Sequence, residues 1–147
     1  MPLKAQITDD MKSAMKAGDK ERLRVVRLAL AAIKQVEIDQ RIEMDDVAVL
    51  TVLDKMVKQR RDSVEQFQAG NRKDLADIEL AEIAILDTYL PEQLGDTELD
   101  ELIAAAFTAT GASSIRDMGK VMAEIKTRAA GRADMGAVGA KVKARFG

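Results

Sequence analysis

Apolar residues recur along the whole chain at the three- and four-residue spacing of helices that bury one face. In the first half, Leu23, Val26, Leu30 and Ile33 follow this spacing. No segment alternates strictly between apolar and polar positions, and no Asn-Gly or Asp-Gly pair joins two apolar runs as in a hairpin. The pattern therefore predicts an all-α protein.

Capping and stop residues place the first predicted helices. Thr8 is expected to cap a first helix, and Gly18 is expected to end it. A second helix is expected from Asp19 to about Val36, followed by a polar connection over residues 38–45. These signals predict two neighbouring helices near the start of the chain.

Two further helices are expected before residue 91. The third begins after Asp45 or Asp46 and ends at Gly70. Asn71 is expected to cap the fourth, which Leu90-Pro91 stops because proline disfavours helical geometry in the preceding residue. The apolar seam of this fourth helix is predicted to consist of Leu75, Ile78, Ala81, Ile85 and Tyr89.

Pro91 is the predicted boundary between two domains, an N-terminal bundle of about four helices over residues 1–91 and a small three-helix unit over residues 96–147. The small unit starts with a helix that ends at Gly111. Two near-copies follow, Asp117–Lys126 and Asp134–Lys143, which share the pattern Asp-Met-Gly-x-Val-x-Ala. A unit of about fifty residues buries little surface, so we expect it to lean on the first domain or on a partner.

Gly119 lies in the first turn of the first copy, where glycine costs about 0.5–1 kcal/mol relative to alanine. Close approach of another group to the backbone is the usual reason for such a glycine. That group is either a neighbouring helix or a phosphate backbone, and the sequence leaves both open.

Charge is distributed unevenly, although the net charge of the chain is only -2. Residues 1–69 hold thirteen Lys and Arg against twelve Asp and Glu, residues 70–102 hold two against ten, and residues 103–147 hold eight against three. A basic terminal segment is typical of proteins that meet nucleic acid. Its cations are Arg116, Lys120, Lys126, Arg128, Arg132, Lys141, Lys143 and Arg145.

A second interpretation of these cations is that they decorate the solvent face, or pair with the acidic fourth helix of the same molecule. The few aromatic residues lie mostly on apolar stripes that a core would use, so we do not expect them to stack on bases. If RNA is the partner, phosphate contacts and shape would then carry recognition, which suits a folded RNA better than a single strand.

The chain contains no histidine and no cysteine, which excludes imidazole and thiolate catalysis, disulfides and zinc sites built on thiolates. It also lacks the glycine-rich phosphate loops of nucleotide-binding proteins. Glu79 and Glu82 could hold a magnesium ion or act as an acid–base pair, but such spacing is usual on solvated helix faces. We therefore expect no catalytic residue, no metal and no cofactor.

The longest apolar runs, Leu28–Ile33 and Leu102–Phe107, fall far short of the roughly 20 residues that span a membrane. The first residues, Met1-Pro2-Leu3-Lys4, lack the apolar stretch of a secretory signal. Together with the lack of cysteine, this predicts a cytoplasmic protein without membrane partners.

Five segments carry a family resemblance: Lys58–Ser63, Ala69–Leu75 (through Ala69-Gly70, Arg72 and Asp74-Leu75), Glu82–Pro91, Asp117–Met122 and Gly131–Asp134. In combination they resemble the YqeY proteins over nearly the whole chain, and the terminal segments are similar to the tail of GatB. GatB belongs to the glutamine-dependent amidotransferase that converts Glu-tRNA(Gln) or Asp-tRNA(Asn) to the amidated form. Its tail binds the outer part of the tRNA.

The resemblance implies an all-helical fold in two parts and the label of a carbon–nitrogen ligase with glutamine as amido-N-donor. Because the catalytic domains of that enzyme have no counterpart in this sequence, we expect no catalysis by this chain alone. Matching positions assign RNA binding to Lys120 and Arg132, and the charge argument adds Arg116, Lys126 and Arg128. The copy at Asp134-Met135-Gly136 lacks a cation at the start of its helix.

Two functions from different classes follow from these observations, and a third, an enzyme that releases ammonia from glutamine through Glu79 or Glu82, is the least favoured. The first is a tRNA-binding module associated with a tRNA amidotransferase or another translation-related protein, with Gly119 allowing close approach to a ribose-phosphate edge and with no DNA partner. The alternative is a helical protein-interaction or regulatory module without RNA binding. In that case the acidic fourth helix or residues 58–61 would recognise another protein.

Overall fold

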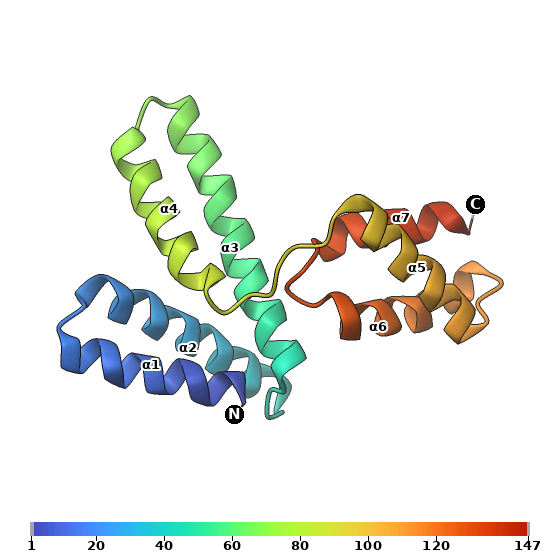
Figure 1. Cartoon of the computed structure of the whole chain (residues 1–147), viewed down its shortest axis with the longest axis horizontal. Helices are drawn as coiled ribbons and strands as arrows, with labels where there is room; N and C mark the ends of the chain where they lie inside the picture. The colour runs from blue at the N-terminus through green and yellow to red at the C-terminus, as the bar shows by residue number, and fades with distance from the viewer. Residues whose placement is uncertain (1, 147) are drawn as a thin grey trace. The chain divides into compact units, whose positions relative to one another are not determined.

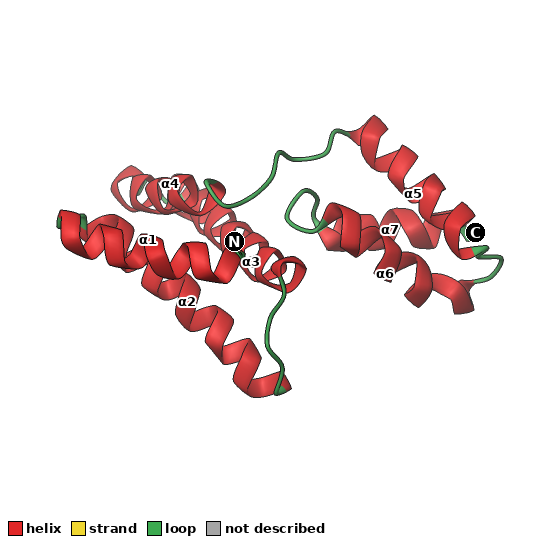
Figure 2. Cartoon of the chain, turned by 60° about the horizontal axis from the view of Figure 1, so that its bottom comes forward, coloured by secondary structure: helices red, strands yellow, loops and turns green. Residues whose placement is uncertain are grey.

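The computed structural model describes residues 2–146 as helices joined by short loops (Figure 2). Within that described range there is no strand, which confirms the all-α class. By internal contacts the chain divides into two units, Met1–Leu90 (unit 1) and Pro91–Gly147 (unit 2). Unit 1 contains α1 (Leu3–Ala17), α2 (Lys20–Gln40), α3 (Asp46–Ala69) and α4 (Lys73–Asp87). Unit 2 contains α5 (Asp96–Thr110), the short 3-10 helix η1 (Ile115–Asp117), α6 (Met118–Ala129) and α7 (Met135–Arg145).

Unit 1 is built from two antiparallel helix pairs, α1 with α2 and α3 with α4 (Figure 1). Each helix turns an apolar stripe towards a common core, in which Ile7, Ile33, Leu53 and Leu86 are fully buried. Removing such side chains from water is the main stabilising contribution, about 1.5–3 kcal/mol for each fully buried one.

A buried carboxylate connects three of the helices of unit 1. Glu82 on α4 is only 4% exposed, and it is the one buried charged residue in the described part of the chain. Arg24 of α2 places Nη1 2.7 Å from its Oε1, and Arg60 of α3 donates Nε–H to its Oε2 at 3.0 Å. The Arg24–Glu82–Arg60 network therefore joins the first helix pair to the second.

A second polar contact connects the same two pairs. The hydroxyl of Tyr89, just after α4, donates to the carboxylate of Asp10 on α1, and Arg22 Nη2 lies 3.9 Å from that carboxylate. Burial, together with the hydrogen bond to Asp10, raises the pKa of Tyr89 to about 12. The neutral phenol is thus the form that the fold stabilises.

Unit 2 packs α5, α6 and α7 around a smaller apolar core, with Ile103, Val121, Ile125, Val138 and Val142 at its centre. The connection between α6 and α7 turns at Gly131, whose φ of 73° lies in the left-handed region that favours glycine. This turn is tied to the segment before α5. Leu94 N–H donates to the Arg132 carbonyl at 2.8 Å, and the Gln93 amide donates to the Gly131 carbonyl at 2.8 Å.

Several predicted helix boundaries are confirmed and others are wrong. Asp19 and Asp45 cap α2 and α3 as expected, each accepting a backbone N–H through its carboxylate. Thr8 is not a cap, because α1 begins at Leu3 and the Thr8 hydroxyl donates to the Lys4 carbonyl inside the helix. Asn71 is not a cap either. It adopts a left-handed conformation (φ 57°) in the turn that precedes α4.

The second helix also continues beyond the predicted end near Val36 and reaches Gln40, so the connection to α3 is shorter than expected. Among the described residues, no helix is both long enough and apolar enough to cross a membrane.

Candidate functional site

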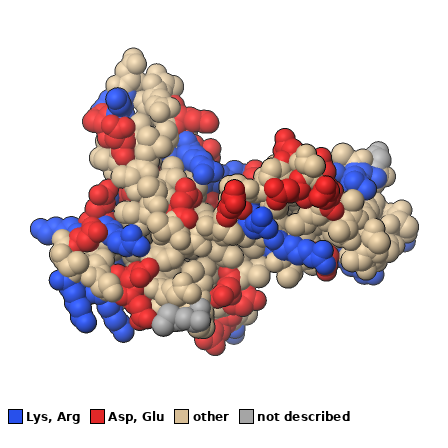
Figure 3. Space-filling model, viewed as in Figure 1, with Lys and Arg blue, Asp and Glu red and all other residues tan. Residues whose placement is uncertain are grey.

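Unit 2 as a whole has no net charge, although its last 45 residues are basic. As a folded unit it contains eight basic and eight acidic residues, because α5 and the segment before it add five carboxylates. In Figure 3, acidic side chains gather over the first half of α5, and basic side chains lie beside them. The expected basic tail is therefore one side of a unit without net charge.

Two of the three cations of α7, Lys141 and Arg145, are engaged within unit 2. Lys141 Nζ lies 3.1 Å from Asp100 and 4.0 Å from Asp96, both on α5. The guanidinium of Arg145 lies over the ring of Phe107 at 5.1 Å from its centroid. Pairing of these cations within unit 2 thus does occur, between α7 and α5.

Arg132, predicted to bind RNA, holds the loop on which it lies. Its Nε–H donates to the Glu92 carbonyl at 3.0 Å, and its own carbonyl accepts the Leu94 N–H. Its guanidinium also lies 4.0 Å from the Glu98 carboxylate. These bonds give Arg132 a structural role in connecting the α6–α7 turn to the start of unit 2.

Lys126 and Arg128 do not share a surface. Successive residues of an α-helix are about 100° apart, which separates these two side chains by about 160° around α6. Arg128 is paired along the helix with Glu124, at 3.0 Å. Lys126 is exposed, and no ion pair involves it within residues 2–146.

Arg116 and Lys120 are both exposed but belong to different elements, Arg116 to η1 and Lys120 to α6. The corner between them is fixed by Asp117. Its carboxylate accepts the N–H groups of Ser113 and Ser114 at 3.0 and 3.4 Å. These two hydrogen bonds, assisted by the charge of Lys120, hold the pKa of Asp117 below its usual value.

Gly119 of α6 and Gly139 of α7 have different surroundings. A Cβ built on Gly139 of α7 would meet the Met122 side chain at 3.8 Å, so this glycine lies against a neighbouring helix. A Cβ built on Gly119 meets nothing within 4 Å, and Gly119 is exposed. Gly139 therefore lies at an ordinary contact distance from α6, whereas Gly119 has no internal neighbour on its Cβ side among the described residues.

On α6, Gly119 and Ala123 form an exposed strip without large side chains between two lysines. At about 100° per residue, Gly119 and Ala123 point in nearly the same direction. Lys126 borders this strip on one side and Lys120 on the other. Ala123 was missed by sequence reasoning, although its spacing of four residues from Gly119 was the available signal.

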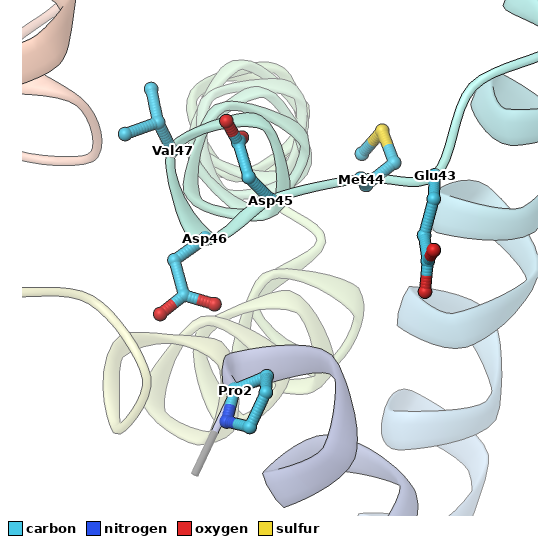
Figure 4. A pocket seen from close by; sticks show the side chains of 6 residues that line it. All are labelled: Pro2, Glu43, Met44, Asp45, Asp46 and Val47. Atoms are coloured by element: carbon cyan, nitrogen blue, oxygen red, sulfur yellow. The ribbon is translucent and has the colours of Figure 1, made fainter.

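A separate hollow of about 790 Å³ lies in unit 1 and is lined by Pro2 and residues 43–47 (Figure 4). Two of its carboxylates serve the fold. Asp45 accepts the Ala48 N–H as the cap of α3, and Asp46 accepts the Leu3 N–H at 2.9 Å. Across the part of the chain that the structure describes, no group of three acidic residues is placed to hold a metal ion.

Glu79 and Glu82, considered above as a metal or acid–base pair, have different surroundings. Glu79 is partly exposed on α4, whereas Glu82 is buried between Arg24 and Arg60. Both oxygens of Glu82 already face a guanidinium. The geometry is that of an internal ion network, which explains why this carboxylate lies inside the fold.

Comparison with known proteins identifies the family. A family model described as Yqey-like protein matches residues 4–146, nearly the full length of the chain. The chain belongs to the YqeY family. This confirms the resemblance seen in the sequence motifs.

Curated relatives of the family carry the name "Altered inheritance of mitochondria protein 41, mitochondrial". The relative from Lachancea thermotolerans is 36% identical over 71% of this chain and 57% of its own length. The one from Pyrenophora tritici-repentis is 31% identical over 82% of this chain and 69% of its own length. The one from Saccharomyces cerevisiae is 31% identical over 79% of this chain and 66% of its own length. In these comparisons the chain spans between about half and two thirds of the relatives.

The names of these relatives contradict the cytoplasmic assignment made from the sequence, because all three are named as mitochondrial proteins. The assignment rested on the lack of cysteine and of an apolar secretory stretch. Neither property distinguishes the cytoplasm from a mitochondrial compartment, so neither could support the choice.

Proposed function

We propose that this protein is a tRNA-binding module that holds a phosphate backbone against α6 of unit 2. One observation carries the proposal. Gly119 is exposed, has no neighbour that a Cβ would touch, and lies between Lys120 and Lys126. A glycine that no internal contact explains is accounted for by a partner that approaches the helix backbone closely.

The chemistry of the strip suits phosphate. Gly119 and Ala123 let a ribose-phosphate edge come near the helix, and the lysines on both sides neutralise phosphates without reading bases. Arg116 extends the cationic border onto η1. Shape and charge would carry recognition, which is how proteins bind folded RNA.

The proposal excludes two of the residues expected from the sequence. Arg132 is bonded to Glu92 and Arg128 to Glu124, so both side chains already have internal partners, whereas the two lysines that border the strip make no ion pair with the described residues. Similarity to the GatB tail supports a unit that holds tRNA for an amidotransferase. The catalytic step of such a carbon–nitrogen ligase is assigned to the partner enzyme and not to this chain.

The test is binding of purified protein to tRNA and to an RNA duplex, titrated against salt. Because the curated relatives are named as mitochondrial, mitochondrial tRNA is the first RNA to use. We expect submicromolar, tRNA-selective binding. Each phosphate contact adds about 0.7–0.9 to the slope of log Kd against log salt, so Lys120→Ala/Lys126→Ala should lower this slope by about 1.4–1.8.

The matched control is Lys12→Ala/Lys143→Ala, which removes the same charge from two exposed positions outside the strip. Gly119→Glu adds bulk and negative charge to the strip and should abolish binding, whereas Gly139→Ala should leave it unchanged. Equal losses in the strip and control doubles would mean that net charge alone matters. That result would overturn the proposed site.

A second candidate function, protein–protein interaction, is favoured by a different observation in unit 1. Ile78 and Leu80 on the acidic helix α4 are 48% and 45% exposed. Residues 58–61, the other segment expected to bind a protein, are not free as a group because Arg60 is part of the Glu82 network.

A further inference from the structure

The outer face of α2 carries a continuous stripe that faces away from the core of unit 1. Its positions follow an alternation of four and three residues, the spacing with which one helix lies along another. The stripe extends over about 30 Å, the length of a 21-residue helix. Its members are Lys20, Arg24, Arg27, Ala31, Lys34 and Ile38, with Leu28 beside them.

The α2 stripe combines positive charge with exposed aliphatic surface. It holds four cations and no acidic residue, and three of the cations, Lys20, Arg27 and Lys34, lie outside the Glu82 network that engages Arg24. Leu28 and Ile38 are 44% and 60% exposed. Between Lys20 and Ala31 the surface is hollowed into a groove with Leu23 and Leu28 along it. Figure 3 shows Lys and Arg side chains gathered where α1 and α2 join, the end at which this stripe starts.

The outer face of α4 carries a second stripe with the same four-and-three spacing and the opposite charge. Its members are Lys73, Asp77, Leu80, Ala84 and Asp87, with Asp74 and Ile78 beside them. Apart from Lys73 at its first position, every charge on this stripe is negative. Aliphatic side chains again lie between the charges.

The two stripes complement each other but cannot meet within one molecule. Inside unit 1, α2 and α4 already contact one another, since Arg24 of the α2 stripe reaches the buried Glu82, which lies outside the α4 stripe. The stripes point outwards from that contact. A basic aliphatic stripe and an acidic aliphatic stripe on the same chain can pair only between two chains.

We propose that the α2 stripe of one copy binds the α4 stripe of a second copy, so that unit 1 mediates self-association. The aliphatic side chains favour a helix over RNA, which gains little from Leu28 or Ile38. Two such contacts related by a two-fold axis close into a dimer, whereas a contact repeated head to tail gives larger assemblies. Either assembly contains the same pairing of α2 with α4.

The test is the mass of the full chain, measured by analytical ultracentrifugation from low to high micromolar concentration at low salt. We expect concentration-dependent association that weakens as salt increases. Arg27→Glu or Asp77→Lys alone should weaken it by about tenfold or more, because each places like charges opposite each other. Both positions are exposed helix surface, and circular dichroism checks that each variant is folded.

The decisive variant is the double charge exchange, Arg27→Glu/Asp77→Lys. Every α2–α4 contact then regains opposite charges, so association should recover beyond that of either single variant. Lys12→Glu is the matched control, since it reverses an exposed charge on α1 outside both stripes. The Lys120→Ala/Lys126→Ala variant should associate normally, which separates this proposal from RNA binding.

Three results would overturn the proposal. The first is a monomer at every concentration, which would leave the stripes to another partner. The second is a double exchange that associates no better than the single variants. The third is an assembly that nuclease treatment dissolves, because RNA would then be the link between copies.

Discussion

Each of the two units is stabilised in its interior by a different kind of contact. In unit 1 the contact between helix pairs includes a buried carboxylate held by Arg24 and Arg60. In unit 2 the buried side chains of the described residues are apolar, and the ion pairs lie near the surface. The difference teaches that unit 1 depends on one charge in its interior, whereas unit 2 depends on the packing of a small core.

The largest expected effect concerns the interior charge of unit 1. Glu82→Gln leaves the guanidinium of Arg60, which is 15% exposed, without its ionic partner. Removing one member of a buried ion pair costs about 3–5 kcal/mol. Urea unfolding, followed by the loss of helical circular dichroism, measures the change in the free energy of unfolding.

Glu79→Gln is the control for this substitution, because it changes the same residue type on the same helix at a partly exposed position. It should alter the free energy of unfolding by no more than about 0.5 kcal/mol. If the two variants lost equal stability, the interior ion network would not distinguish unit 1.

The core of unit 2 gives the next largest effect. Ile125→Ala removes a fully buried side chain from α6 and should cost about 2–5 kcal/mol. A unit of this size has little stability to lose. Hydrogen exchange should therefore show loss of protection over α5, α6 and α7 while α1 to α4 stay protected.

Ile115→Ala is the matched variant, since Ile115 is 51% exposed on η1 in the same unit. It should leave the exchange pattern unchanged. Simultaneous loss of protection in both units by Ile125→Ala would contradict separate cores.

A pH titration distinguishes the units without changing a residue. The pKa of Tyr89 is raised to about 12 in unit 1, whereas an unfolded tyrosine has a pKa of about 10. The folded state therefore holds the proton more tightly. The resulting stabilisation is fully present below pH of about 10 and is lost as pH rises towards about 12.

Tyr89 is the single tyrosine of the chain, so its ionisation can be followed directly by ultraviolet absorbance. We expect a midpoint near 12, and Asp10→Asn should bring it closer to the usual value. Tyr89→Phe should flatten the dependence of stability on pH over this range. A midpoint near 10 in the folded protein would disprove the buried contact.

The smallest effect concerns the strip on α6. Gly119→Ala should stabilise unit 2 by about 0.5–1 kcal/mol, because alanine favours the helix and its Cβ meets open space. Thermal unfolding measures this gain. A loss of stability would show that an internal contact, and not an external partner, explains the glycine.

The sequence predicted the helices well because capping and periodicity are local properties. Asp19, Asp45 and Gly111 mark helix ends as expected. The predicted seam of α4 was wrong at Ile78, although Ile85 and Tyr89 do pack against the core. Ile78 was expected to face the core, but it is about half exposed, and Ile83 and Leu86 are buried together with Glu82. This orientation depends on arginines from α2 and α3, which no pattern within α4 reveals.

The candidate site was predictable in part. Lys120 and Gly119 were found from the repeat, and both lie on the exposed strip of α6. Arg132 was assigned to RNA from its position in the Gly131–Asp134 motif, and its bond to Glu92, forty residues away in the chain, could not be foreseen from that motif. The apparent basic tail arose in the same way, since the acids of α5 that balance it precede residue 103.

The hydrogen bonds from Gln93 and Leu94 to the turn at Gly131 and Arg132 determine where a fragment that contains unit 2 should begin. A fragment that starts at the first residue of α5 omits Glu92, Gln93 and Leu94 and removes the anchors of that turn. A graft that starts at Pro91 keeps them. The fragment that folds as unit 2 is therefore longer than its helices, and a fusion protein should include the linker residues 91–95.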